Sequence, residues 1–560
     1  MLNEAQRLQA RAEADEFLLV KDKFQLGHLP TEQSHPETRN MDELVRDDLG
    51  QAINVFKKID INAIETVLAQ GRQFNAMKAD MRDTLRKGGR IFFYGCGATG
   101  RLSLSTGYMW RYMLDNYDEL PKAVKKRFYN HIRSITKGSD LDGLPLKDRI
   151  KGLRGRIVDF MTGGDVALVN SIESAEDYPE WAAEHLRDLG FGRNDLLIAS
   201  TEGGETPSVL GALEEAANIS DRQQYLTYCN PDRTLENIER SKRALDDPRI
   251  TKICLNSGPM ALAGSTRLQA TTMQQLLAEG ALFGLSQKDI KQFRDFTAKT
   301  DFSFMAPFIE KEAQINLQGD NISYRLDERV ANIVFTDVTE RNPTFSYPPL
   351  KHIFDEHANP SSTYVVIKDT KQGKDAFWTL LRRDPDTLET EALKDRAGME
   401  TLLKFDFSEA ATHRGISGES LHIFDISQNE NSKVSFQLDD LKHEIDLSAL
   451  HPVCQQLFVK MTMNMHSTLF MGKLDRYKGN WMSWVKPSNN KLIDRCVRYV
   501  QDMLENEGHG EHSYEDICYA LFEERMELAV NEPIVLKVFD RLSKGGDAYN
   551  RGAAPTTPGL

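Results

Sequence analysis

The stretch IFFYGCGATGRL, residues 91–102, decides the fold class. An apolar, β-rich run over Ile91–Gly95 leads into a glycine-rich loop, and a helical pattern follows at once. Glycines let the backbone turn tightly, and the N-terminus of the following helix presents free N–H groups that favour an anion. This order of strand, glycine loop and helix predicts a phosphate-binding loop at one edge of an α/β sheet.

Further apolar runs repeat this arrangement along the first half of the chain. They alternate with helix-length amphipathic segments, such as 207–217 and 235–245, and they cover residues 157–161, 196–200, 225–229 and 252–256. Alternating strands and helices are typical of a doubly wound parallel sheet. We therefore predict one α/β domain here, with its last helix at about 268–285.

A second series of strand-like runs predicts a second α/β domain of similar size. These runs cover residues 331–335, 363–367, 401–407, 421–426 and 434–438, with helical spacers such as 374–382. Beyond residue 451 the apolar residues recur at helical spacing only. The expected division is an N-terminal extension (1–50), a first α/β domain (51–300) with a basic insertion (121–156), a second α/β domain (301–450) and an all-helical domain (451–560).

Composition narrows the classes of function. The 560 residues carry 70 Lys and Arg against 84 Asp and Glu, a net charge of −14 that argues against nucleic acid as the main partner. The six cysteines show no CxxC spacing, so neither a zinc site nor a disulfide framework is expected, and no cofactor is predicted. With a polar N-terminus and no long apolar run, we expect a cytoplasmic protein without a membrane anchor.

A second polar loop, STEGGETP at residues 200–207, follows the apolar run 196–200 and precedes a helix. Pro207 suits a first helical turn, and Thr201 and Thr206 carry hydroxyls that could bind the same anion. Two such loops in one sheet predict a crevice at the carboxyl ends of its strands. Glu202 and Glu205 would repel a phosphate there unless they meet a cation such as Arg101.

The first loop also matches the GxGxxG pattern of dinucleotide-binding proteins. That site needs an acid near the end of the next strand to bind the ribose, and no acid ends a second β-run at the required offset. NAD binding is therefore disfavoured.

Five motifs together resemble a known family. They are LPTEQSHPET, GCGATGRL, GGDVALVNSIESAED, IASTEGGETPSVLGALEEA and GSTRLQATT, and they occur in the order found in N-acetylmuramic acid 6-phosphate etherases and the glucokinase regulatory protein. These are sugar isomerase (SIS) domain proteins. The segments VKMTMNMHSTLFMGK and GNWMSWVKPSNNKLIDRCVRYV resemble the helical part that follows the SIS domain. The resemblance implies two flavodoxin-like SIS domains and a C-terminal all-helical lid.

The resemblance also implies which residues bind a sugar phosphate. Lys460 matches a lysine that reaches the phosphate, whereas the corresponding position of the first repeat is Gln275, so we expect one working site. Glu173 and Glu176 match two sugar-contacting acids, and Glu176 is the candidate catalytic residue. The other candidate binding residues are Gly97, Thr99, Gly100, Arg101, Thr201, Gly203 and Thr206.

One position departs from the etherase pattern. Ether cleavage by elimination needs one group that removes a proton and another that protonates the leaving oxygen, and the family uses two glutamates. An ungapped continuation from the first loop places Met109 at the position of the second glutamate, and a thioether cannot transfer a proton. Asp115 or Asp118 could substitute only if the helix were shifted.

The sequence therefore leaves two functions open. One is a lyase or isomerase acting on an amino-sugar phosphate, and the other is a ligand-dependent regulator of a sugar kinase. Under either function, we expect a monomer with an internal pseudo-dimer or a homodimer. The segment Thr336 to Thr344, expected as a loop after the run 331–335, lacks glycine and predicts a mainly structural second domain. His352 and the basic insertion are interpreted as surface features.

Overall fold

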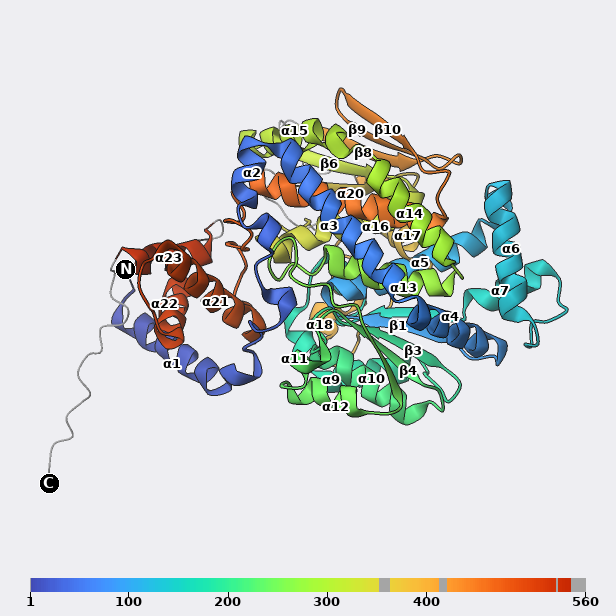
Figure 1. Ribbon diagram of the computed structural model, residues 1–560, viewed down its shortest axis with the longest axis horizontal. Helices are drawn as coiled ribbons and strands as arrows, with labels where there is room; N and C mark the ends of the chain where they lie inside the picture. The colour runs from blue at the N-terminus through green and yellow to red at the C-terminus, as the bar shows by residue number, and fades with distance from the viewer. Residues whose placement is uncertain (1, 352–362, 412–420, 530–531, 545–560) are drawn as a thin grey trace.

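The computed structural model describes residues 2–351, 363–411, 421–529 and 532–544, and it contains two five-stranded sheets with helices between and around them (Figure 1). The first sheet has the order β2-β1-β3-β4-β5, and all its pairings are parallel. Its strands are β1 (Ile91–Gly95), β2 (Ile157–Met161), β3 (Leu196–Ser200), β4 (Gln224–Tyr228) and β5 (Ile250–Cys254).

Both polar loops of the first sheet lie at the same edge. Gly95, the last residue of β1, pairs with Met161 and with Ser200, the last residues of its two neighbours. Helix α5 (Gly97–Asp115) begins directly after β1, and α10 (Pro207–Ile219) begins after the β3 loop. The predicted crevice at the carboxyl ends of the strands is therefore where the two helices begin.

The second sheet has the order β10-β9-β8-β6-β7, in which β7, β6 and β8 are parallel and β9 and β10 are antiparallel. Its strands are β6 (Asn321–Leu326), β7 (Thr363–Ile367), β8 (Leu421–Gln428), β9 (Lys433–Leu438) and β10 (Leu441–Asp446). The parallel trio repeats the arrangement of β2, β1 and β3. Consequently β6 and the following helix α16 (Glu328–Phe345) correspond to β1 and α5.

Two of the predicted strands of this sheet are wrong. Residues 331–335 lie inside α16, which is buried on almost all sides, so its apolar run could not be distinguished from a buried strand. Residues 401–407 end the short helix α19 (Met399–Leu402) and continue without regular pairing. The sequence reading missed β6 and β10, and the segment Thr336 to Thr344 is helix rather than loop. His352 lies outside the described residues.

Helices pack between the sheets and around them (Figure 1). The central ones are α3 (Leu49–Ala69), α13 (Gln269–Leu282) and α20 (Pro452–Lys473), and nearly every residue of α20 is buried. The others around the two sheets are α2 (Met41–Asp47), α4 (Gly71–Arg86), α8 (Val166–Val169), α9 (Pro179–Asp188), α11 (Asp232–Leu235), α12 (Glu239–Asp246), α14 (Gln287–Lys299), α15 (Met305–Gln318), α17 (Gly373–Leu381) and α18 (Lys394–Ala397).

Two groups of helices lie at opposite ends of the molecule (Figure 1). At one end, α1 (Glu4–Val20) packs against α22 (Tyr514–Met526), which packs with α21 (Asn490–Glu507) and α23 (Ile534–Ser543). At the other end, the basic insertion forms α6 (Lys122–Thr136) and α7 (Leu146–Arg154). In the described part of the chain, no helix is long and apolar enough to cross a membrane.

Candidate functional site

A cavity of about 140 Å³ lies at the carboxyl edge of the first sheet. It is lined by the N-terminus of α5, the loop after β3 and the segment Gly264 to Arg267, and also by residues of α16 and of the stretch 482–495. Segments far apart in the sequence therefore enclose one space.

The first loop presents the N-terminus of α5 to this cavity. Gly97 and Ala98 line it, and the first N–H groups of a helix have no partner within the helix. Gly97 has φ +55°, a left-handed conformation that favours glycine, and a Cβ there would have nothing within 4 Å. The Thr99 hydroxyl instead donates to the Cys96 carbonyl at 2.9 Å, so Thr99 caps its own helix.

The second loop turns Thr206 and Glu202 toward the cavity and keeps Thr201 away from it. The Thr201 hydroxyl is fully buried and lies 2.8 Å from that of Thr206. The carbonyl of Gly203 accepts a hydrogen bond from the Asn230 amide at 3.0 Å. Thr201 and Gly203 thus hold the shape of the loop.

Lys491 brings a positive charge to the negative side of the cavity. Its ammonium lies 3.0 Å from Glu205 and 3.4 Å from Glu176. Burial acts to lower the pKa of Lys491, but Glu176 and Glu205 raise it above its ordinary value. Glu205 also pairs with Arg240 at 2.6 Å, so Lys491 and Arg240, rather than Arg101, compensate this acid.

Glu202 is the acid of the cavity that changes its charge near neutral pH. Burial raises its pKa to about 7, and the Glu340 carboxylate acts in the same direction. The side chain lines the cavity and is only 8% exposed. Glu202 can therefore release or accept a proton in the physiological range.

Helix α16 of the second sheet contributes to the same site. Glu340 lines the cavity and accepts a hydrogen bond from Arg101 at 2.5 Å. Asp337 pairs with Arg267 at 2.8 Å, and both side chains are almost completely buried. The expectation of a mainly structural second unit is thus corrected, because α16 supplies Glu340 to the wall of this cavity and Asp337 to that of a smaller cavity beside it.

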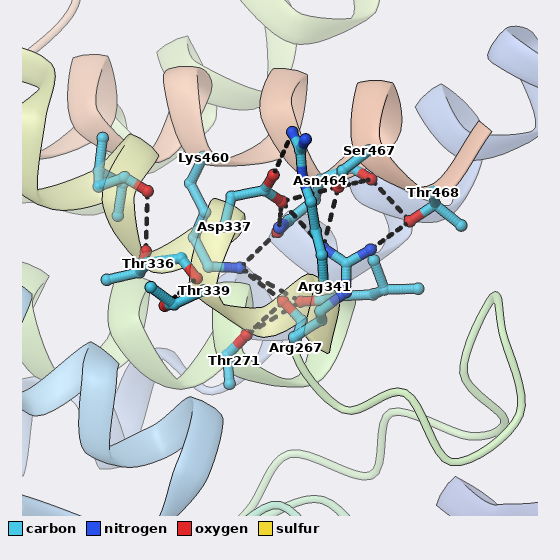
Figure 2. Close-up of polar contacts among 12 residues, drawn as sticks. Arg267, Thr271, Thr336, Asp337, Thr339, Arg341, Lys460, Asn464, Ser467 and Thr468 are labelled. Atoms are coloured by element: carbon cyan, nitrogen blue, oxygen red, sulfur yellow. Dashed lines mark hydrogen bonds and ion pairs between the residues drawn. The ribbon is translucent and has the colours of Figure 1, made fainter. Parts of the chain in front are cut away.

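Lys460 lies beside this cavity in a dense polar cluster (Figure 2). Its ammonium donates to the Arg267 carbonyl at 3.0 Å and to the side chains of Thr272 and Asn464 at 2.9 Å each. Burial lowers the pKa of Lys460 to about 7. Lys460 and Arg101 line a smaller cavity of about 20 Å³, which shares Ala98, Arg267 and Glu340 with the larger one.

Met109 and Glu340 occupy matching positions in the two corresponding helices. Met109 lies as far along α5 from its first residue, Gly97, as Glu340 lies along α16 from Glu328. Met109 does not line the cavity that contains Glu176, whereas Glu340 does. A carboxylate is therefore present in the second unit at the helix position that corresponds to Met109.

The N-terminal motif contacts the cavity through α21. Glu32 accepts hydrogen bonds from Arg495 at 2.7 and 3.0 Å, and Arg498 lies 3.2 Å away. Burial acts to raise the pKa of Glu32, but the two arginines lower it to about 2. Arg495 also lines the cavity, so this ion pair connects the LPTE motif to the site.

The structure brings together part of the predicted set. Glu176, Gly97 and Thr206 line the larger cavity, and Arg101 and Lys460 line the smaller one. Thr99, Gly100, Thr201 and Gly203 shape the two loops, and Glu173 begins the short helix η5 (Glu173–Asp177), its side chain lying outside the described part. All these binding roles stay predictions.

Sequence reasoning missed five charged residues of the two cavities. Arg267 lies in the GSTRLQATT motif, and Lys491 and Arg495 lie in the segment GNWMSWVKPSNNKLIDRCVRYV. Both stretches resemble the family, so the resemblance could have indicated these three residues. Asp337 and Glu340 carried no such signal, because their helix was read as a strand and a loop.

Two α/β units that enclose one polar cavity at a helix N-terminus agree with the class of SIS-domain proteins, which the sequence motifs resemble. The chain is 30% identical over 253 residues to the N-acetylmuramic acid 6-phosphate etherase of Lactococcus lactis subsp. cremoris (strain SK11), a match that covers 45% of this chain and 68% of the relative. It is 26% identical over 305 residues to that of Aliivibrio fischeri (strain MJ11), covering 54% and 83%. The chain belongs to the N-acetylmuramic acid 6-phosphate etherase family.

Solved structures give weaker similarities. The tagatose-6-phosphate ketose/aldose isomerase of Escherichia coli matches with a TM-score of 0.34 and 10% identity, over 78% of this chain and 97% of that one. The C-terminal domain of glucosamine-fructose-6-phosphate aminotransferase from Francisella tularensis matches with a TM-score of 0.35 and 11% identity, over 76% and 97%. No protein-family model matches the chain.

Proposed function

We propose that the larger cavity binds a sugar phosphate and that the protein is a lyase acting on an amino-sugar 6-phosphate. The observation that carries the proposal is the joint presence, in one cavity, of an open helix N-terminus at Gly97 and Ala98 and of three carboxylates, those of Glu176, Glu202 and Glu340. A helix N-terminus favours a phosphate, and carboxylates accept hydrogen bonds from sugar hydroxyls.

The charges of the side chains that line the cavity support a ligand whose phosphate lies at the N-terminus of α5. Lys491, Arg267 and Arg495 line the cavity together with the N-terminus of α5, so the phosphate has cations within its surroundings. Lys491 and Arg240 neutralise Glu205, which leaves Glu202 as the acid of the second loop that can repel a phosphate. Lys460 lies one layer deeper, where it holds Arg267 and Asn464 in place.

The acids support an elimination. Cleavage of the lactyl ether of N-acetylmuramic acid 6-phosphate, the compound in the relatives' name, requires that one group remove a proton from the sugar and another protonate the departing ether oxygen. Glu176 is the proposed base. Glu340 and Glu202 are the proposed sources of the second proton, and a pKa near 7 suits Glu202 for that step. No described contact favours the alternative of a sugar-kinase regulator.

The test is the release of lactate from N-acetylmuramic acid 6-phosphate. The wild-type protein should release lactate, Glu176→Gln should release none, and both should bind the sugar phosphate in calorimetry. Binding without lactate release in the wild type would retain the binding site and reject the lyase. The absence of binding in the millimolar range would reject both.

A further inference from the structure

A second cavity lies at the position in the second unit that corresponds to the site of the first. It has a volume of about 60 Å³ and is lined by the start of α16, by the loop after β8 and by the start of α20. The C-terminal part of α5 closes it with Met109, Tyr112 and Met113. The first cavity has the reverse arrangement, since it combines the start of α5 with the later part of α16.

The second cavity is not built for a phosphate. The carboxylate of Asp327 occupies the N-terminus of α16, where it accepts hydrogen bonds from the backbone N–H groups of Arg329 at 2.9 Å and Val330 at 3.3 Å. The same side chain also accepts from the backbone of Gln428 at 2.6 Å. At the outer side of the cavity, Glu119 and Glu430 are exposed and add negative charge. Arg329 also lines the cavity, but its single positive charge is outnumbered by the carboxylates of Asp327, Glu119 and Glu430, so the surroundings are negative on balance and disfavour an anionic ligand.

Gln456 points to a ligand of another kind. Its side chain lines the cavity and is 7% exposed, and neither its amide nitrogen nor its amide oxygen has a hydrogen-bond partner within the described structure. A flipped amide, with the nitrogen and the oxygen exchanged, would not satisfy Gln456 either, because both positions lack partners. An unpaired buried amide costs about 1–3 kcal/mol, so such a group is retained where something else binds it.

The adjacent Gln455 gives the contrast. Its amide nitrogen donates to the carbonyls of Leu447 and Leu450 at 3.1 and 3.0 Å, and its oxygen accepts from Gln428 at 2.7 Å. Gln455 thus ties the start of α20 to its surroundings. Gln456 is the neighbouring glutamine that is left for a ligand.

We propose that the second cavity binds a small uncharged molecule through a carboxamide, or an equivalent adjacent donor and acceptor, that pairs with the amide of Gln456. A carboxamide matches the nitrogen and the oxygen of Gln456 at the same time. Met109, Met113 and Val124 supply an apolar wall for the remainder of the molecule. This site is independent of the sugar phosphate, and neither Gln456 nor Asp327 lines the first cavity.

The test compares nicotinamide with nicotinate, which has the same shape but is an anion at pH 7.5. Calorimetry should show nicotinamide binding in the millimolar range and nicotinate at least about tenfold more weakly. Gln456→Leu should weaken nicotinamide binding at least about tenfold, without weakening the binding of a sugar phosphate. A crystal soaked in nicotinamide should show the carboxamide on Gln456.

The melting temperature of the Gln456 variant distinguishes a ligand-binding role of this side chain from a structural one. Since Gln456 makes no hydrogen bond in the described structure, Gln456→Leu should leave the melting temperature unchanged or raise it, while Gln455→Leu should lower it. Three results would overturn the proposal: equal binding of nicotinamide by wild type and Gln456→Leu, a lower melting temperature for Gln456→Leu, or only ordered water on Gln456 in the soaked crystal.

Discussion

The ammonium of Lys491 lies 3.4 Å from the carboxylate of Glu176, although the two residues are 315 positions apart in the sequence. Glu176 follows β2 of the first sheet, and Lys491 lies in the first turn of α21. Both line the cavity at the N-terminus of α5. The helical C-terminal part therefore completes the site of the first α/β unit.

Removal of the Lys491 charge should weaken sugar-phosphate binding. In Lys491→Met, Glu176 loses its cation and the cavity becomes more negative, so the dissociation constant should rise about tenfold to a hundredfold, as is typical for a charge-assisted contact. The control is Lys478→Met, because Lys478 pairs with Glu507 and does not line the cavity. Calorimetry on both variants makes the comparison, and equal affinities would show that Lys491 has no part in binding.

Glu340, and not Met109, should matter for turnover. Glu340→Gln keeps the shape of the side chain and removes its ability to transfer a proton, so lactate release should fall about a hundredfold or more. Met109→Leu should stay within about twofold, since volume-conserving core changes are tolerated. The rates of lactate release by the two folded variants test this prediction. If Met109→Leu were the more damaging change, the match between the two helix positions would have no functional meaning.

The pH dependence of binding should report Glu202. Burial raises the pKa of Glu202 to about 7, so this acid is mostly neutral at pH 6 and negatively charged at pH 8. A phosphate monoester is mostly dianionic above its second pKa of about 6, and repulsion should therefore weaken binding as the pH rises from 6.5 to 8. In Glu202→Gln this loss of affinity should become smaller.

Lys460 is the competing source of the same pH dependence. Burial lowers its pKa to about 7, so it loses positive charge over the same range. An undiminished pH dependence in Glu202→Gln would assign the effect to Lys460 instead. Calorimetry of N-acetylglucosamine 6-phosphate at several pH values measures both.

The Glu32 ion pairs should stabilise the closed arrangement of α21. The pKa of Glu32 is lowered from 4.5 to about 2, so its stabilisation is fully present above pH 4.5 and is lost as the pH falls toward 2. Glu32→Gln leaves Arg495 and Arg498 without their partner and should cost about 3–5 kcal/mol of stability at pH 7. Melting temperatures of both proteins should differ by a constant amount from pH 8 to 5 and converge below 4.5. A difference that grows in acid would refute the assignment.

Sequence patterns predicted the first α/β unit well because its strands are short apolar runs between clear turn signals. The five runs from 91–95 to 252–256 coincide with β1 to β5 to within two residues at each end. In the second unit the same reasoning failed at α16. Nearly every residue of α16 is buried, the polar ones included, so periodicity alone could not separate residues 331–335 from a strand.

The candidate site was predictable where its residues lie in loops and less so where they come from another unit. Gly97, Thr206 and Glu176 follow strands of one sheet, and parallel strands bring their carboxyl ends together. Glu340 and Lys491 reach the cavity only through the packing of α16 and α21 against the first unit. Such packing cannot be read from local spacing.

The most direct test of the central claim is calorimetry with N-acetylglucosamine 6-phosphate and with the unphosphorylated sugar, on the wild type, Ala98→Asp and Ala98→Asn. Ala98 is in the first turn of α5 and lines the cavity, and an acid is well tolerated at that helix position. The wild type and Ala98→Asn should bind only the phosphorylated sugar, and Ala98→Asp should bind it at least about a hundredfold more weakly. Equal binding of both sugars by the wild type, or equal affinities in Ala98→Asp and Ala98→Asn, would contradict a phosphate site at the N-terminus of α5.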